Sequence, residues 1–229
     1  MFESLQRLVV VLVFLLLVSP AYSAIQIAAT RIAPPDVEPS QEFSTSDVRF
    51  QSRGKEYTTY FTPSGLIVAG FTGSNDGPQY FEMGMQLLDS QKDVEISTLN
   101  PMLASHDRWL TTLPDYAQIK YANVYPGVDM ICFGNTNQLE MQFMIAAGGN
   151  VNRIRLRLTG NNDVESTPDG GLRLISGNKS IDMPHPVGYQ LDATGTKQTV
   201  EARYVVNSSK QISLRIGAFD PKRPLILNP

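Results

Sequence analysis

The sequence contains a single cysteine, Cys132, and only two histidines, His106 and His185, among its 229 residues. One cysteine excludes an intramolecular disulfide, so packing and hydrogen bonds must hold the fold together. Neither histidine has a second metal ligand at a recognised spacing, and neither belongs to a recognisable nucleophile motif. We therefore expect no metal site, no cofactor and no catalytic residue, and we expect Cys132, in the apolar run VDMICF, to be a small buried side chain.

Charge is also scarce, because charged residues make up 18% of the chain and the net charge is −3. No basic run is present, which argues against a nucleic-acid partner. No segment after the N-terminus carries a long amphipathic helical pattern, and no internal repeat is visible, which argues against a propeller of similar blades. The length is enough for one domain with a sizeable core.

The N-terminus has the pattern of a secretory signal, which we assign to residues 1–23. Arg7 precedes an unbroken apolar run over residues 8–18, Pro20 follows, and Ala21 and Ser23 stand where a signal peptidase reads small residues. The run would span about 16 Å as a helix, against about 30 Å for a bilayer core. We expect export to the periplasm, cell surface or exterior and no transmembrane span in the mature chain, with an uncleaved anchor as the alternative.

The remainder of the sequence predicts an all-β protein. Residues 24–47 are rich in Pro, Ser and Thr without periodicity, so we interpret them as a flexible arm or linker. From residue 48 to 229, runs such as IRLRLTG and QISLRIGAF alternate apolar and polar side chains, and turn sequences such as PDGG and DATGT separate them. This pattern predicts a single domain of roughly a dozen short strands, as an antiparallel sandwich or an open barrel.

Several segments together resemble a known family. They include YPGVD at residues 125–129, LE at 139–140 and AFDPKRPL at 218–225, within matches that cover most of residues 48–229. The chain is similar to the N-terminal domain of unknown function that precedes SBBP-type β-propeller repeats in bacterial cell-surface proteins. The resemblance implies an exported surface domain, possible partnership with separately encoded propeller or surface modules, and no catalytic residues to transfer.

The segment YANVYPGVDMICFGNTNQLEMQF, residues 121–143, contains the best candidate site residues. Asp129 and Glu140 could form a catalytic carboxylate pair if neighbouring strands brought them together. Asp129, however, follows the turn at Pro126 and Gly127, where a carboxylate ordinarily braces the backbone. Glu140 sits on an alternating strand opposite its apolar side, where it would meet water or an arginine. We therefore interpret the segment as strands and corners.

Aromatic residues offer a second kind of candidate site, since Trp109 and Tyr121 with other tyrosines could form a sugar-stacking platform. Packing in the core or at its rim is the competing interpretation. Three functions thus remain open at this point: a non-catalytic contact domain at the cell surface, a carbohydrate- or polymer-binding module, and a hydrolase using Asp129 and Glu140. The binding candidates are Trp109, Tyr121, Asp129 and Glu140.

Overall fold

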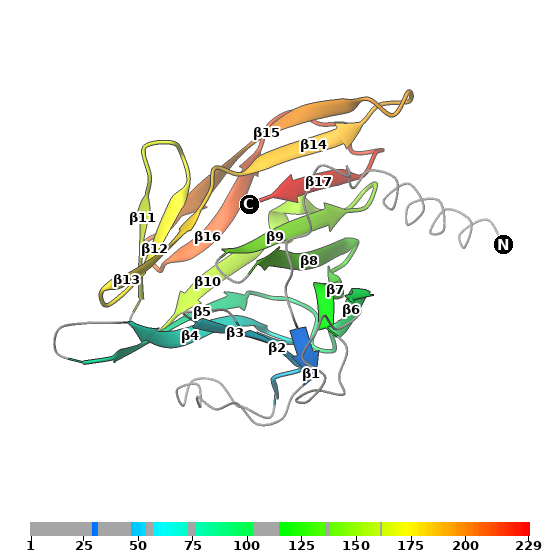
Figure 1. Cartoon of the computed structure of the whole chain (residues 1–229). Coiled ribbons are helices and arrows are strands. Elements are labelled where there is room, and N and C mark those ends of the chain that lie inside the picture. The colour runs from blue at the N-terminus through cyan, green and yellow to red at the C-terminus, as the bar shows by residue number, and fades with distance from the viewer. Residues whose placement is uncertain are drawn as a thin grey trace.

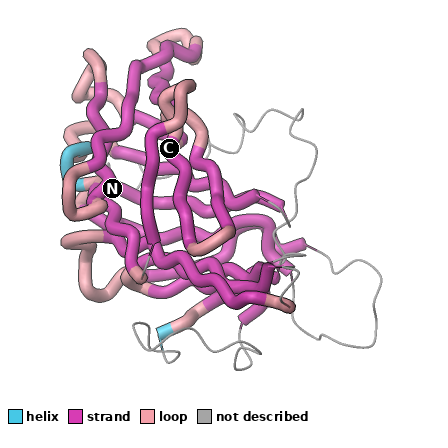
Figure 2. Tube along the Cα trace, turned by 90° about the vertical axis from the view of Figure 1, so that its left-hand side faces the viewer, coloured by secondary structure: helices cyan, strands magenta, loops and turns pink. Residues whose placement is uncertain are grey.

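The computed structural model describes residues 29–31, 47–53, 57–72, 77–102, 115–135, 138–160 and 162–229. Within these ranges the chain forms seventeen β-strands and the short 3-10 helix η2 (Val151–Arg153), with no α-helix (Figure 2). The all-β prediction is therefore confirmed. No helix in the described part of the chain is long and apolar enough to span a membrane.

Fourteen of the strands form one antiparallel sheet, whose order mixes neighbours in sequence with distant ones (Figure 1). The first half of the sheet, in spatial order, is β1 (Ala29–Arg31), β2 (Phe50–Arg53), β3 (Tyr57–Thr62), β4 (Gly65–Thr72), β5 (Gln79–Leu87), β10 (Arg155–Thr159), β16 (Gln211–Ile216) and β15 (Lys197–Val206). The second half is β14 (Val187–Leu191), β17 (Leu225–Asn228), β9 (Gln138–Ile145), β8 (Val128–Asn135), β7 (Asp115–Tyr125) and β6 (Glu95–Met102).

The sheet curls so far that its two ends approach each other. The evidence is that β1, at one end of the strand order, contacts β7 near the other end. Two tyrosines of β7 form hydrogen bonds to β4 and β10, which lie across the core. The Tyr121 hydroxyl donates to the Gly65 carbonyl at 3.1 Å, and the Tyr125 hydroxyl donates to the Arg155 carbonyl at 3.1 Å. Of the two architectures that the sequence allows, the curled single sheet is closer to an open barrel.

A separate three-stranded sheet covers one side of this barrel (Figure 1). It consists of β11 (Asn162–Ser166), β12 (Leu172–Ser176) and β13 (Lys179–Met183). Leu172, Leu174 and Met183 join the main core, and the Ser176 hydroxyl donates to the Glu82 carbonyl of β5 at 3.0 Å. The small sheet therefore completes the hydrophobic enclosure that the curled sheet leaves open.

Most buried apolar residues form one core that includes side chains from both halves of the sheet, and Val48, Tyr60, Ile67 and Ala69 form a smaller second cluster. Leu156 and Leu158 of β10 point inward, as do Ile212 and Leu214 of β16, and all four are buried. Cys132 is fully buried in the same core, and burial raises the pKa of its thiol to about 12. The prediction that Cys132 is a small buried side chain is thus confirmed.

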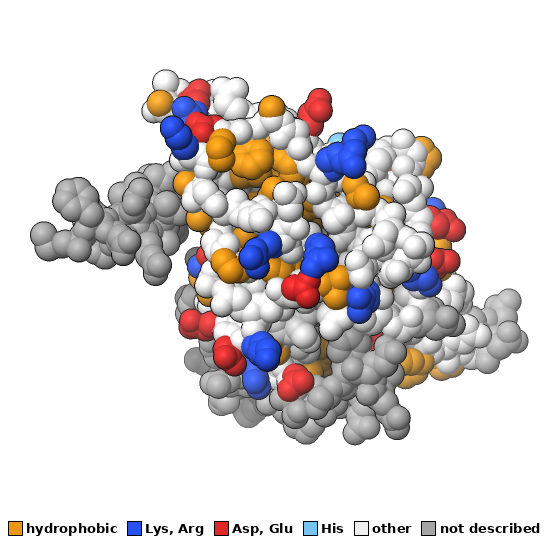
Figure 3. Space-filling model, turned by 180° about the vertical axis from the view of Figure 1, so that it is seen from behind, with side chains coloured by type: hydrophobic (Ala, Val, Ile, Leu, Met, Phe, Trp, Pro, Cys, Tyr) orange, Lys and Arg blue, Asp and Glu red, His pale blue; other side chains and the backbone are white. Residues whose placement is uncertain are grey.

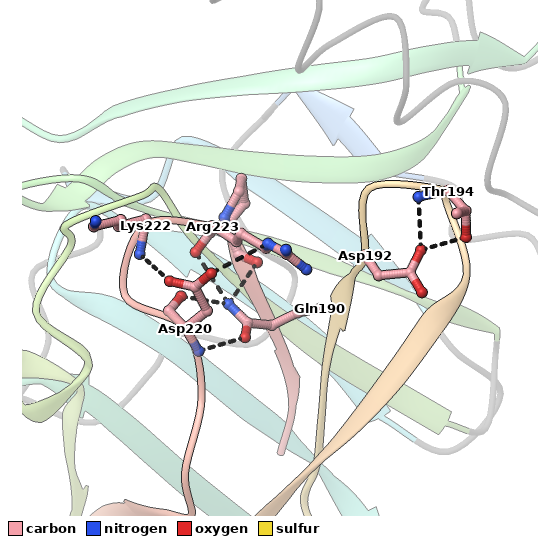
Figure 4. Close-up of polar contacts among 7 residues, drawn as sticks. Gln190, Asp192, Thr194, Asp220, Lys222 and Arg223 are labelled. Atoms are coloured by element: carbon pink, nitrogen blue, oxygen red, sulfur yellow. Dashed lines mark hydrogen bonds and ion pairs between the residues drawn. The ribbon is translucent and has the colours of Figure 1, made fainter.

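The C-terminal segment is held by one buried amide (Figure 4). Gln190 of β14 donates from Nε2 to the carbonyls of Asp220, Arg223 and Pro224, and its Oε1 accepts the Asp220 N–H at 2.8 Å. Beyond this loop, β17 inserts between β14 and β9, where Leu225 and Leu227 are fully buried. The end of the sequence is therefore part of the barrel wall.

The described residues add two details to the expected organisation. They contain seventeen strands against the rough dozen expected, because strands as short as β1, β2 and β17 span too few residues to show a clear alternation. Within the expected arm or linker, residues 29–31 pair antiparallel with β2. Three residues are too few to show alternation, and their pairing comes from backbone groups that any sequence supplies. Residues 1–23, the expected signal, lie outside the described ranges.

Candidate binding face

Asp129 braces an irregularity in the β7–β8 hairpin. The register between these strands shifts between Tyr121 and Tyr125, and Asn123 there adopts a left-handed φ of 52°. Asp129 accepts the Asn123 N–H at 2.6 Å, and its other oxygen lies 2.8 Å from the Lys120 ammonium. Asn123 in turn accepts the Gly127 N–H at 3.0 Å. Both oxygens of Asp129 therefore have structural partners.

Glu140 lies on the same outward face of the sheet as Asp129 but well separated from it. Asp129 is opposite Met144 in the register, and Glu140 is opposite Phe133. Asp129 and Glu140 are therefore separated by four residues along the strand direction and by one inter-strand step, which together amount to about 14 Å. Carboxyl pairs in glycoside hydrolases are closer, at roughly 5–9.5 Å. The structure does not bring the two carboxylates into one site.

The tyrosines of the candidate stacking platform mostly face inward. Tyr121 and Tyr125 are fully buried, and burial is the main cause that raises the pKa of Tyr121 well above its usual value. Tyr189 is half-buried, and the Lys197 ammonium lies 3.8 Å from its ring centroid. Trp109 falls outside the described residues. The ring faces of Tyr121 and Tyr125 are thus not available to a sugar.

The loop carboxylates and His185 have turn roles. Asp169 accepts a hydrogen bond from the Thr167 hydroxyl, which is the main cause that lowers its pKa. Asp163 accepts the Val164 N–H at 2.9 Å, and exposed His185 lies against the Gly170 carbonyl. No group of three or more His, Cys, Asp or Glu side chains in the described residues could hold a metal ion.

A cluster of arginines that sequence reasoning did not select covers one outward face of the barrel. It consists of Arg155 and Arg157 of β10, Arg215 of β16 and Arg203 of β15, which we call the arginine face. Arg203 lies directly opposite Arg215, and Arg155 is opposite Ser213, two positions along β16 from Arg215. The inward neighbours of these residues are buried core side chains, so the alternation directs all four arginines away from the core.

Only one of these four arginines has a polar partner in the part of the chain that the structure describes. Arg155 forms an ion pair with Asp89, whereas Arg157, Arg203 and Arg215 make no hydrogen bond or ion pair there. Glu201 lies two positions from Arg203 on β15 and on the same face. The direct Arg203–Arg215 pairing is unfavourable, since like charges opposite each other on adjacent strands repel. Local conflicts of this kind concentrate at functional sites.

A broad open concavity of about 580 Å³ adjoins the arginine face. Its floor comes from β16 and β15, including Ser213, Arg215 and Val205, and one wall comes from the loop of residues 148–152. Val205 is an exposed large hydrophobic residue, and half-buried Phe219 lines the concavity beside it. The concavity therefore offers a guanidinium, amide and hydroxyl groups and small apolar surfaces together. Figure 3 shows a face of the molecule on which lysine and arginine side chains lie beside hydrophobic patches.

A signal for this face was present in the sequence but was incomplete. IRLRL, VEARYVV and ISLRIG each place arginines on the polar side of an alternating strand. What the sequence did not indicate is that β10 and β15 both pair with β16, which gathers the three strands' arginines.

A family model described as a domain of unknown function (DUF7948) matches residues 37–229. The chain belongs to this family. No curated protein and no solved structure matches it. The DUF7948 match begins before the domain start expected at residue 48 and includes every strand from β2 onward.

Two segments that stood out in the sequence have structural roles in this DUF7948 domain. In YPGVD, Tyr125 holds β10, Gly127 adopts a φ of +74° and Asp129 braces the hairpin. In AFDPKRPL, the backbone carbonyls of residues 220, 223 and 224 bind Gln190. The arginine face lies outside both of these segments.

Proposed function

We propose that this DUF7948 chain is an exported, non-catalytic domain that acts by contact at the bacterial cell surface, through the arginine face and its concavity. The observation that carries the proposal is the set of exposed arginines, Arg203 and Arg215 above all, without partners in the described residues. A purely structural surface would place opposite charges across adjacent strands, because such pairs stabilise a sheet. Like charges that repel each other on adjacent strands are better explained if an anionic partner binds between them.

The positions and partners of the two candidate carboxylates support the proposal that the domain is non-catalytic. Asp129 has both oxygens engaged by Asn123 and Lys120, and Glu140 lies about 14 Å away. A hydrolase would need such groups to converge on a cleft. The concavity beside the arginine face instead has no carboxylate among its lining residues.

Export is supported by the N-terminal sequence, with cleavage after Ser23 as the expected processing step. The resemblance to domains that precede SBBP-type propellers supports a cell-surface setting, and it suggests that separately encoded propeller or surface modules act beside this chain. Mass spectrometry of the protein from its native envelope tests the export step. A mature form that still begins at Met1 would contradict it.

The contact role is tested with purified protein and isolated native envelope. We expect wild-type protein to sediment with envelope material, and we expect the double variant Arg203→Gln/Arg215→Gln to remain mostly in the supernatant. The charge control is Arg173→Gln/Lys179→Gln, which removes the same formal charge from the three-stranded sheet, where Arg173 is paired with Asp182. Equal binding by both double variants and wild type would show that the arginine face is not the contact surface.

A further inference from the structure

We infer that the ligand of the arginine face is an acidic polysaccharide, with carboxylate-bearing sugars held in the concavity against β16 and β15. This inference rests on the proposed function and specifies its partner.

The charge of the face requires an anionic partner. Arg203 and Arg215 face each other across β15 and β16. In the described part of the chain Asp89 already pairs with Arg155, and Glu201 forms no ion pair with Arg203 or Arg215. The whole chain, in contrast, has a net charge of −3. A second copy of this chain would therefore need to present a particular acidic surface, whereas an anionic polymer satisfies the face directly. A guanidinium binds a carboxylate through two parallel N–H donors, which gives direction as well as attraction.

Recognition between Arg203 and Arg215 must occur through side chains. Residues 202–206 of β15 and 212–216 of β16 are paired with each other, so an acidic peptide could not add as a further strand between the two arginines. This favours a ligand that binds across this part of the sheet surface by its own functional groups.

The lining groups suit sugar rings better than bases or lipid chains. Asn150 and Asn152 bring amides, Ser213 brings a hydroxyl, and Val205 and Phe219 bring small apolar surfaces. Sugars present both hydroxyl groups and apolar C–H faces, so one ring can use all three kinds of group. Single-stranded nucleic acid instead needs several exposed aromatic rings for stacking, and here Phe219 is the one ring among the lining residues. A volume of about 580 Å³ lies within the ordinary range for small-ligand sites.

The unfavourable Arg203–Arg215 pair gives the inference a distinctive test. Replacing Arg203 by Gln removes the cross-strand repulsion, so the folded protein should become slightly more stable while it loses its ligand. If Arg203 had only a structural role, its replacement by Gln would lower the melting temperature. A variant that failed to fold would lose both its melting transition and its ligand binding. Thermal unfolding of each variant therefore separates loss of the site from loss of the fold.

The experiment measures binding of the purified protein to immobilised polygalacturonate, with neutral dextran as the uncharged control. We expect wild type to bind polygalacturonate and not dextran, and we expect binding to weaken as salt rises. The affinity of Arg203→Gln/Arg215→Gln for polygalacturonate should be lower than that of wild type by roughly tenfold or more, since two charge-assisted contacts are lost. Arg203→Lys/Arg215→Lys should fall between, because lysine keeps the charge without the two-donor geometry. The Arg173→Gln/Lys179→Gln control should bind as wild type does.

Two further polymers distinguish the sources of negative charge. Tighter binding to heparin than to polygalacturonate would still support an acidic polysaccharide and would indicate sulfate-bearing sugars. Equal binding to inorganic polyphosphate would overturn the inference, because it would show attraction to any polyanion. Absence of binding to every acidic polysaccharide, while native envelope is still bound through the arginine face, would overturn the inference and leave the proposed contact role intact.

Discussion

At the residue scale, Asp129 is the carboxylate whose role the structure defines best. Asp129→Ala leaves the Asn123 N–H and the Lys120 ammonium without their acceptor. We expect a loss of about 1–3 kcal/mol in the free energy of unfolding, and a loss of about 1 kcal/mol for Asp129→Asn, which keeps one acceptor oxygen. Urea unfolding measures both variants. Glu140→Gln serves as the control and should stay within about 0.5 kcal/mol of wild type, and a larger loss in Glu140→Gln than in Asp129→Ala would reverse this assignment.

Burial in the core makes the Cys132 thiol unreactive. It is fully buried, and burial raises the pKa of its thiol to about 12, so almost no thiolate exists at pH 8. We expect a thiol reagent such as 5,5′-dithiobis(2-nitrobenzoate) to label the folded protein at pH 8 extremely slowly and the denatured protein within seconds to minutes. Cys132→Ala, which has no thiol, gives the background. Rapid labelling of folded protein would show that the thiol is accessible.

Asp192 links stability to pH through the turn between β14 and β15. Its carboxylate accepts hydrogen bonds from the Thr194 hydroxyl and N–H (Figure 4) and from the Thr196 N–H, and these bonds lower its pKa to about 2. In the unfolded chain an aspartate titrates near pH 3.9. Because the folded pKa is the lower one, the stabilisation is fully present above about pH 4 and is lost as the pH falls toward 2.

The measurement compares wild type with Asp192→Asn. The difference in melting temperature between the two proteins should be constant from about pH 5 to 7 and should shrink between pH 4 and 2. A difference that is independent of pH over the whole range would indicate that the Asp192 charge has no part in the turn.

At the element scale, β17 is the strand that joins distant parts of the sheet. It lies between β14 and β9, so its removal would separate strands that are not otherwise paired. Leu225 and Leu227 are fully buried there. We expect Leu227→Ala to cost about 2–5 kcal/mol and deletion of residues 218–229 to prevent stable folding.

Circular dichroism and thermal unfolding measure both of these changes. Lys222→Ala, in the exposed loop that precedes β17, is the matched control and should be close to neutral. A truncated protein that melts at the temperature of the full chain would show that β17 is dispensable.

The strands themselves could be predicted well from the sequence, whereas their partners could not. In IRLRLTG and QISLRIGAF the alternation correctly separates inward Leu156 and Ile212 from outward Arg155 and Arg215. Alternation assigns a side chain to a face but contains no information on which strand lies alongside. The pairing of β10 with β5 and β16 depends on backbone hydrogen bonds that every residue can form, so it becomes visible only in three dimensions.

The candidate site was difficult to predict for the same reason. Tyr121 and Asp129 attracted attention because unusual residue types are close together in the sequence, and both have structural roles. The arginine face assembles from three strands spread over residues 155–216, each with an ordinary polar alternation. Gln190 was missed as well, because nothing local distinguishes a buried glutamine that binds a distant loop from one that faces water.

At the scale of the whole molecule, the curled sheet and the small sheet share one hydrophobic core. This core contains side chains from β3, β4 and β5 near one end of the strand order and from β7, β8 and β9 near the other, and residues from β12 and β13 complete it. The hydrogen bonds from Tyr121 to Gly65 and from Tyr125 to Arg155 connect opposite walls. The strands that contribute side chains to this core could not separate from one another without exposing part of it.

This arrangement predicts a single cooperative unfolding transition. Far-ultraviolet circular dichroism, which follows the strands, and near-ultraviolet circular dichroism, which follows packed aromatic rings such as Tyr121, should give coincident thermal curves. Tyr121→Phe removes only the hydroxyl that bonds the Gly65 carbonyl, so it should lower stability by about 1–2 kcal/mol and shift both curves together. If the sheet instead consisted of two weakly coupled layers, loss of this bond would displace the near-ultraviolet transition to lower temperature and leave the far-ultraviolet transition in place. Two separated transitions would therefore contradict a barrel built on one core.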